Sequence, residues 1–132
     1  RGQQLTGRIR TYSVSSSLLT LQAFVFSVDE VGRPTRNVAL LVNLADAPVD
    51  VELSLAPRSH NALSHSRSEW ELTAAGGDMH ARHVLLNGAA SPLSMTADGS
   101  VEPSVWTGLV KDVGEPIVLA PRAVKIIVQQ RN

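Results

Sequence analysis

Val38-Ala39-Leu40-Leu41-Val42-Asn43 is the stretch that decides the fold. It is almost continuously aliphatic, and we expect it at the centre of a sheet. After the turn at 45–48, residues Val49–Leu55 alternate, with valine and leucine at odd positions and Asp50, Glu52 and Ser54 between them. Strict alternation predicts a strand with one face inside the protein and the other in water.

Similar short runs, each bounded by turn residues, recur about every ten residues in both directions from this centre. No window longer than about ten residues keeps the i, i+3, i+4 apolar spacing of a helix that buries one face. Asn87-Gly88 is a two-residue hairpin signal, because both residue types tolerate a positive φ. We expect residues 97–115 to form a long connection. The sequence therefore predicts an all-β fold, an antiparallel β-sandwich of roughly eight strands with little or no helix. The further predicted strands are Arg8–Val14, Leu19–Val28, Ser68–Thr73, His83–Leu86, Ser91–Thr96, Ile117–Leu119 and Ala123–Gln130.

The alternation also predicts which side chains point inward. In Ser68–Thr73 we expect Trp70 and Leu72 inside and the two glutamates on the wet face. In the last strand we expect the valines and Ile126 inside, with Lys125 and Gln129 pointing away. Phe24 and Phe26 share a face and are expected in the core. The predicted core residues are Leu41, Val51, Leu53, Trp70, Ile126 and Val128.

Composition narrows the class of protein. The 132 residues fit a single domain, 1–132. Twelve basic residues balance twelve acidic ones, which argues against nucleic acid or an anionic membrane surface as a partner. No apolar run approaches the ~20 residues of a membrane-spanning helix, so we expect no membrane span. The absence of cysteine removes disulfides and thiolate metal sites.

Two groups of residues are candidates for chemical sites. The histidines are His60, His65, His80 and His83, and they fall in polar segments without the convergent donors of a zinc site. Glu69 and Glu71 share a strand face, but a general acid needs a carboxyl whose pKa is raised by burial, and this face is predicted to be wet. No nucleophile motif or phosphate-binding loop is present. We expect no metal, no cofactor and no catalytic residue in this chain. A sugar-binding platform would depend on Trp106, the one aromatic residue outside the predicted strands.

The order of these features resembles a known family. Val38–Leu44, the Glu69-Trp-Glu-Leu-Thr73 strand, a glycine-rich break, the Val84-Leu-Leu-Asn-Gly88 hairpin, and Pro116-Ile-Val-Leu119 before Pro121 are similar to the C-terminal β-sandwich of heparanase-like glycoside hydrolases, family 79. The chain departs from that family after the final proline, at 123–126.

The resemblance implies a fragment or separated domain of a secreted or lysosome-like glucuronidase. In that family such a sandwich packs on a (β/α)8 barrel of the same parent chain, and the barrel holds the catalytic glutamates. Polysaccharide is a further expected partner, and an independent carbohydrate-binding or protein-interaction module is the alternative. If the sandwich docks on a barrel, we expect the docking surface in residues 1–14 and at four apolar residues that no predicted strand buries. These are Val105, Trp106, Leu109 and Val110.

Overall fold

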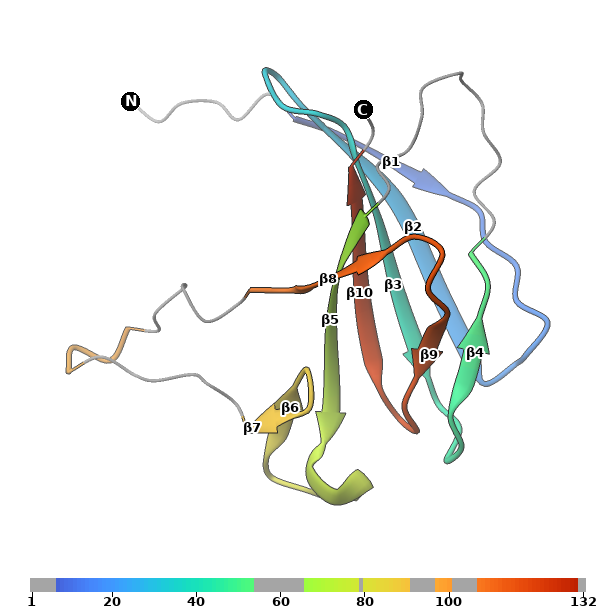
Figure 1. The fold of residues 1–132 in the computed structure, drawn as a ribbon, viewed down its shortest axis with the longest axis vertical. Helices are drawn as coiled ribbons and strands as arrows, with labels where there is room; N and C mark the ends of the chain where they lie inside the picture. Colours follow the sequence, from blue (N-terminus) through green and yellow to red (C-terminus); the bar gives the residue numbers. More distant parts are fainter. Residues whose placement is uncertain (1–6, 54–65, 79, 91–96, 101–106, 131–132) are drawn as a thin grey trace.

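The protein is all-β and antiparallel, as the sequence predicts (Figure 1). The structure is a computed structural model that describes residues 7–53, 66–78, 80–90, 97–100 and 107–130. Apart from one short 3-10 turn at Ala75–Gly77, its regular elements in this part of the chain are strands. They are β1 Gly7–Tyr12, β2 Leu21–Glu30, β3 Arg36–Asn43, β4 Val49–Val51, β5 Ser66–Ala74, β6 Val84–Leu86, β7 Ala89–Ala90, β8 Leu109–Asp112, β9 Ile117–Leu119 and β10 Val124–Gln130.

The strands form a large sheet and a small one. The main sheet has the order β1-β2-β3-β10-β5-β6-β7, and β8 pairs with β5 outside this path. β3 lies inside the sheet between β2 and β10, which confirms the central position predicted from its aliphatic run. β4 and β9 pair with each other and form the second layer, which lies in front of the main sheet in Figure 1.

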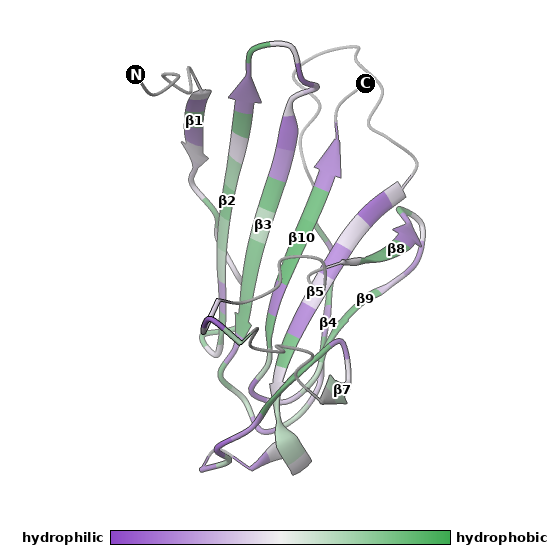
Figure 2. Ribbon diagram, turned by 90° about the vertical axis from the view of Figure 1, so that its left-hand side faces the viewer, coloured by the Kyte–Doolittle hydropathy of each residue, from purple (hydrophilic) through white to green (hydrophobic). Residues whose placement is uncertain are grey.

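The core lies between these two layers. Leu41 of β3 and Leu119 of β9 are fully buried and meet there with Val25, Ala39, Ile117 and Ile127. Figure 2 shows the central parts of β2, β3 and β10 as hydrophobic, whereas β5 carries hydrophilic positions along its length. We call the side of the main sheet that faces β4 and β9 the inner face.

The predicted inward side was wrong for β5 and β10. Glu69 and Lys125 are buried on the inner face, whereas Trp70, Ile126 and Val128 lie on the opposite face and are only half-buried. Phe24, expected in the core, is 53% exposed on that same opposite face. Val51 and Leu53 pack partly buried against the core, and Leu41 is buried as predicted. The expectation that the apolar face of an alternating strand is the buried one fails here, because the second layer covers the face that carries the charges. These charges can be buried because they pair with one another.

Two further predictions concern connections. The Asn87-Gly88 hairpin is confirmed, with φ of 51° and 78° between the paired strands β6 and β7. The prediction of a long connection over 97–115 is wrong in part, because β8 lies within it. The predicted strand Ser91–Thr96 lies outside the described residues.

Candidate functional site

Two of the four predicted docking residues are described by the structure. Leu109 and Val110 lie on β8 and are 50% and 73% exposed. They are neighbours in a strand, so they point to opposite faces of the sheet. Val110 pairs with Ser68 and faces away from the second layer, and Leu109 pairs with Glu69 on the inner side. Val105 and Trp106 lie outside the described residues. In the segment 7–14, every residue is exposed.

Val110 belongs to a much larger apolar surface, which we call the outer apolar face. It is the side of the main sheet that faces away from β4 and β9. The strand registers place on it fifteen apolar side chains larger than alanine. The chain at Gly108 crosses the Trp70 ring on this face, and the second layer lies on the opposite side of the sheet. The members of the outer apolar face are Ile9, Phe24, Phe26, Val28, Val38, Leu40, Val42, Trp70, Leu72, Val84, Leu86, Val110, Val124, Ile126 and Val128.

The inner face carries a buried charge network between β5, β8 and β10. Glu69 is 2% exposed, and its Oε1 accepts a hydrogen bond from Arg67 Nε at 2.8 Å. The other carboxylate oxygen, Oε2, lies 3.2 Å from Lys111 Nζ and 3.5 Å from Lys125 Nζ. Lys125 also lies 3.4 Å from Glu71 Oε2. Each buried charge in the network therefore has an opposite charge in contact, as burial requires.

The same cations bind the backbone around the second layer. Arg67 donates from Nη1 to the carbonyl oxygens of Asp112 and Val113, and from Nη2 to that of Glu115. Lys125 donates to the carbonyl of Val118 in β9 at 2.7 Å. The network thus holds β9 and the turn before it on the main sheet, which is a structural task.

The surroundings of Glu69 favour the ionised form of its carboxyl group. Its burial alone would raise the pKa, but the Arg67 hydrogen bond, the charge of Lys125, and the hydrogen bond and charge of Lys111 outweigh burial. The pKa of Glu69 is therefore lowered below its usual range, and the carboxylate stays ionised. Proton donation near neutral pH requires the opposite shift. The sequence pattern predicts the wet face for Glu69, so its buried position is a correction to that prediction.

The described histidines form no metal site. His80 and His83 are exposed near the turn that follows β5. No group of three or more metal-ligating side chains occurs within the described ranges. His60 and His65 lie outside them.

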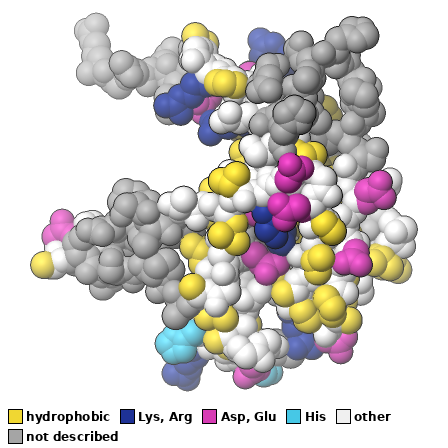
Figure 3. All heavy atoms as spheres, viewed as in Figure 1, with side chains coloured by type: hydrophobic (Ala, Val, Ile, Leu, Met, Phe, Trp, Pro, Cys, Tyr) yellow, Lys and Arg dark blue, Asp and Glu magenta, His cyan; other side chains and the backbone are white. Residues whose placement is uncertain are grey.

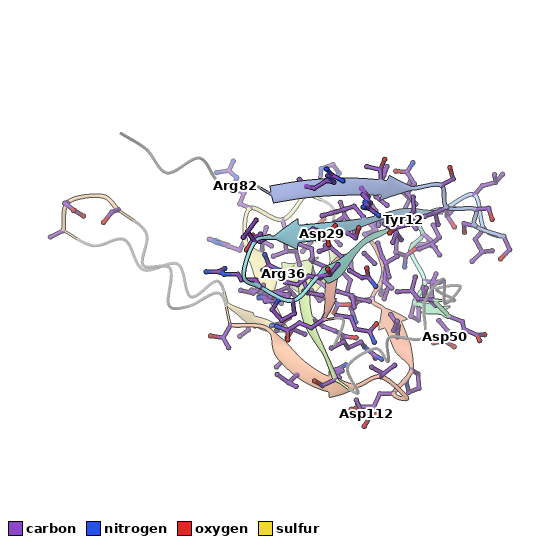
Figure 4. The ribbon with its side chains drawn as sticks, turned by 90° about the horizontal axis from the view of Figure 1, so that it is seen from above. Tyr12, Asp29, Arg36, Asp50, Arg82 and Asp112 are labelled. Carbon is purple, nitrogen blue, oxygen red and sulfur yellow. The ribbon has the colours of Figure 1, made fainter. Side chains whose placement is uncertain are left out.

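The inner face also carries a groove that the sequence analysis missed. It has a volume of about 1040 Å³ and lies between β1, β2 and β3 on one side and β4 on the other. Figure 4 labels Tyr12 and Asp50, two of its lining residues, which come from β1 and β4. Asn37 of β3 lies in its wall, and both polar atoms of the Asn37 amide are buried without a hydrogen bond. A buried polar group that forms no hydrogen bond costs on the order of 1–3 kcal/mol of folding free energy. In the sequence, the sign of this groove was an asparagine at position 37, on the same face of β3 as Ala39 and Leu41.

Comparison with known proteins adds no family to this geometry. No family model matches the chain, and no curated protein matches it. Among the described residues, no helix has the length and apolar character to cross a membrane.

Proposed function

We propose that this chain is a non-catalytic accessory β-sandwich of a heparanase-like, glucuronidase-type glycoside hydrolase. In this proposal it packs against and stabilises the (β/α)8 catalytic barrel of the same parent polypeptide. The catalytic residues belong to the barrel, and the sandwich contributes a docking surface. The observation that carries the proposal is the outer apolar face of the main sheet.

The outer apolar face supports a large and lasting contact. Isolated soluble domains rarely expose contiguous apolar patches beyond a few hundred Å². Here four large apolar side chains lie opposite one another on the neighbouring strands β2, β3, β10 and β5: Phe24, Leu40, Ile126 and Trp70. Such a surface gains about 25 cal/mol for each Å² that a partner removes from water. The space-filling view in Figure 3 presents a different surface, the one carrying β9 and β4, where hydrophobic side chains are interspersed with acidic and basic ones. A mixed surface of that kind is suited to contact with water.

A matched pair of substitutions tests this docking. Phe24→Gln removes an exposed ring from the outer apolar face, and Val31→Gln makes a similar change at the exposed β2–β3 turn. In the polypeptide that carries the barrel, we expect Phe24→Gln to lower the free energy of unfolding by about 2 kcal/mol, since a buried Phe side chain is worth roughly 1.5–3. Val31→Gln should leave it unchanged. In the isolated sandwich, neither substitution should be destabilising.

Equal effects of the two substitutions in the parent polypeptide would contradict docking through this face.

The isolated chain should also give no turnover of an aryl glucuronide above buffer. Turnover that is lost in Glu71→Gln would assign catalysis to the sandwich itself. Binding of a polysaccharide by the isolated chain, with no effect of Phe24→Gln in the parent, would favour the independent carbohydrate-binding module.

A further inference from the structure

The second layer of the sandwich is much narrower than the first. In the part of the chain that the structure describes, it consists of β4 and β9, whereas the main sheet has eight strands. Among the described residues, β4 pairs with β9 along one edge, and no strand pairs with its other edge. Its other side borders the groove described above, together with the inner faces of β1 and β2. The groove therefore occupies the position of the next strand of the second layer.

The groove has two kinds of lining: core-type side chains, and polar side chains from the segment 10–17 together with Asp50 and Glu52. Val25 and Leu41 belong to the buried core cluster, and Leu21, Ala23 and Leu53 pack against that cluster from the groove side. The hydrophobic core thus continues into the groove wall and reaches solvent there. The aliphatic part of this lining favours an occupant with apolar side chains, because their burial removes apolar surface from water.

Asn37 indicates what kind of polar group the occupant carries. It is 5% exposed, and its Nδ2 and Oδ1 have no hydrogen-bond partner. Asn43 lies on the same face of β3, and its Nδ2 donates to the backbone carbonyls of Ala47 and Ala120. Lys125, also on the inner face, donates to the backbone of β9. Asn43 and Lys125 therefore bind the backbone that lies opposite them, whereas Asn37 lines the groove.

The charges along β4 define the complementary sequence pattern. Val49 and Val51 are turned inward, and Asp50 and Glu52 are exposed between and after them. Neither carboxylate forms an ion pair with the described residues. Directly opposite positions of paired strands share a face, and opposite charges there are stabilising. A strand beside β4 therefore matches best with aliphatic residues facing inward and Lys or Arg facing Asp50 and Glu52.

We propose that this groove binds an extended segment of a separate polypeptide, which adds as a third strand to the free edge of β4. The segment alternates aliphatic and basic residues, and its backbone supplies the hydrogen bonds that Asn37 lacks. Exposed strand edges are templates for such additions, in which the main chain provides affinity and alternate side chains provide specificity. This site is on the inner side of the main sheet and does not depend on docking through the outer apolar face.

The test uses two synthetic peptides of one composition. The first is Lys-Val-Lys-Val-Arg-Val-Thr with blocked ends, and the second holds the same residues as Val-Val-Val-Lys-Lys-Arg-Thr. We expect the alternating peptide to bind the chain at least tenfold more tightly by calorimetry. It should also slow hydrogen exchange of the amides at 49–53. Glu52→Lys should weaken its binding at least fivefold.

Asn37→Leu separates the proposal from a purely structural role. It removes two unpaired polar atoms, so it should raise the thermal midpoint of the free chain while weakening the alternating peptide at least threefold. Equal affinity for both peptides, or a lowered midpoint in Asn37→Leu, would overturn the proposal. So would a concentration-dependent dimer that Glu52→Lys abolishes, because a second copy would then fill the groove. A glucuronide oligosaccharide that competes in the groove and binds more tightly than the peptide would assign it to sugars.

Discussion

Leu41 is the side chain on which the two layers meet. It is fully buried in β3 and belongs to the same cluster as Leu119 from the second layer. We expect Leu41→Ala to lower the free energy of unfolding by roughly 2–5 kcal/mol, because truncation leaves a cavity in a packed core. Ile126→Ala, on the half-buried outer apolar face, should cost less than half as much in the isolated chain. Urea unfolding of both variants measures the difference, and equal costs would contradict the assignment of the core to the inner face.

The face of β5 that is buried could not be predicted from the alternation of its residues. Alternation in β5 correctly separates Glu69 from Trp70, but it contains no information about which of the two faces another layer covers. Hydrophobicity favours the Trp70 side, and a self-contained sandwich would bury it. The second layer covers the Glu69 side instead, since Arg67 and Lys125 neutralise the carboxylate there. The unpaired amide of Asn37 was equally invisible, because a missing hydrogen-bond partner is a property of three-dimensional packing.

At the scale of elements, local chemistry was the better guide. The two-residue turn at Asn87-Gly88 could be predicted because few residue pairs adopt positive φ twice in succession. β8 was missed because it is short, and its Leu-Val-Lys-Asp sequence lacks alternation. The approach of β8 to the sheet depends instead on a contact that is distant in sequence. A Cβ atom at Gly108 would lie 2.7 Å from the Trp70 ring, so glycine is what allows the chain to cross the indole there.

The β6–β7 hairpin gives a prediction at this scale. Gly88 has a φ of 78°, and a β-branched residue adopts this conformation only with strain. Gly88→Val should therefore lower the free energy of unfolding by more than the ~1 kcal/mol of an ordinary glycine replacement. Gly88→Asn is the matched control and should cost less, because asparagine tolerates positive φ. Thermal unfolding compares the two, and a Val variant as stable as the Asn variant would exclude the turn.

At the scale of the whole molecule, polar anchors join the two layers. Asn43 holds the segment after β3 and the segment after β9, and Arg67 holds the turn before β9. Lys125 binds β9 itself. These contacts fix the narrow second layer over one half of the main sheet. They leave the groove beside β4 open, and the far side of the sheet has no such anchors among the contacts described above. The two proposed interaction surfaces therefore follow from one feature, a second layer that is narrower than the sheet it covers.

The anchors also make the stability of the fold depend on pH through Glu69. Its pKa in the folded state lies below the ordinary value of 4.5. The unfolded chain therefore binds more protons than the folded one as the pH falls through this range, so stability present above pH ~4.5 is lost towards lower pH. Glu69→Gln removes this carboxylate and leaves the buried Arg67 without the acidic partner described above, while Lys125 keeps Glu71. At pH 7 it should cost about 3–5 kcal/mol.

In acid the wild type loses the stability that the ionised Glu69 contributes. The difference in the free energy of unfolding between wild type and Glu69→Gln should therefore narrow as the pH falls from 5 to 3. Urea midpoints at pH 7, 5, 4 and 3 measure that difference. Glu30→Gln is the control, since Glu30 pairs with Arg36 at the surface. A pair of that kind is worth at most about 1 kcal/mol, and its loss should be small throughout the series. A difference for Glu69→Gln that stays constant from pH 7 to 3 would mean that the network does not hold the layers together through this carboxylate. The attachment of β9 would then depend on the backbone contacts of Arg67 and Asn43 alone.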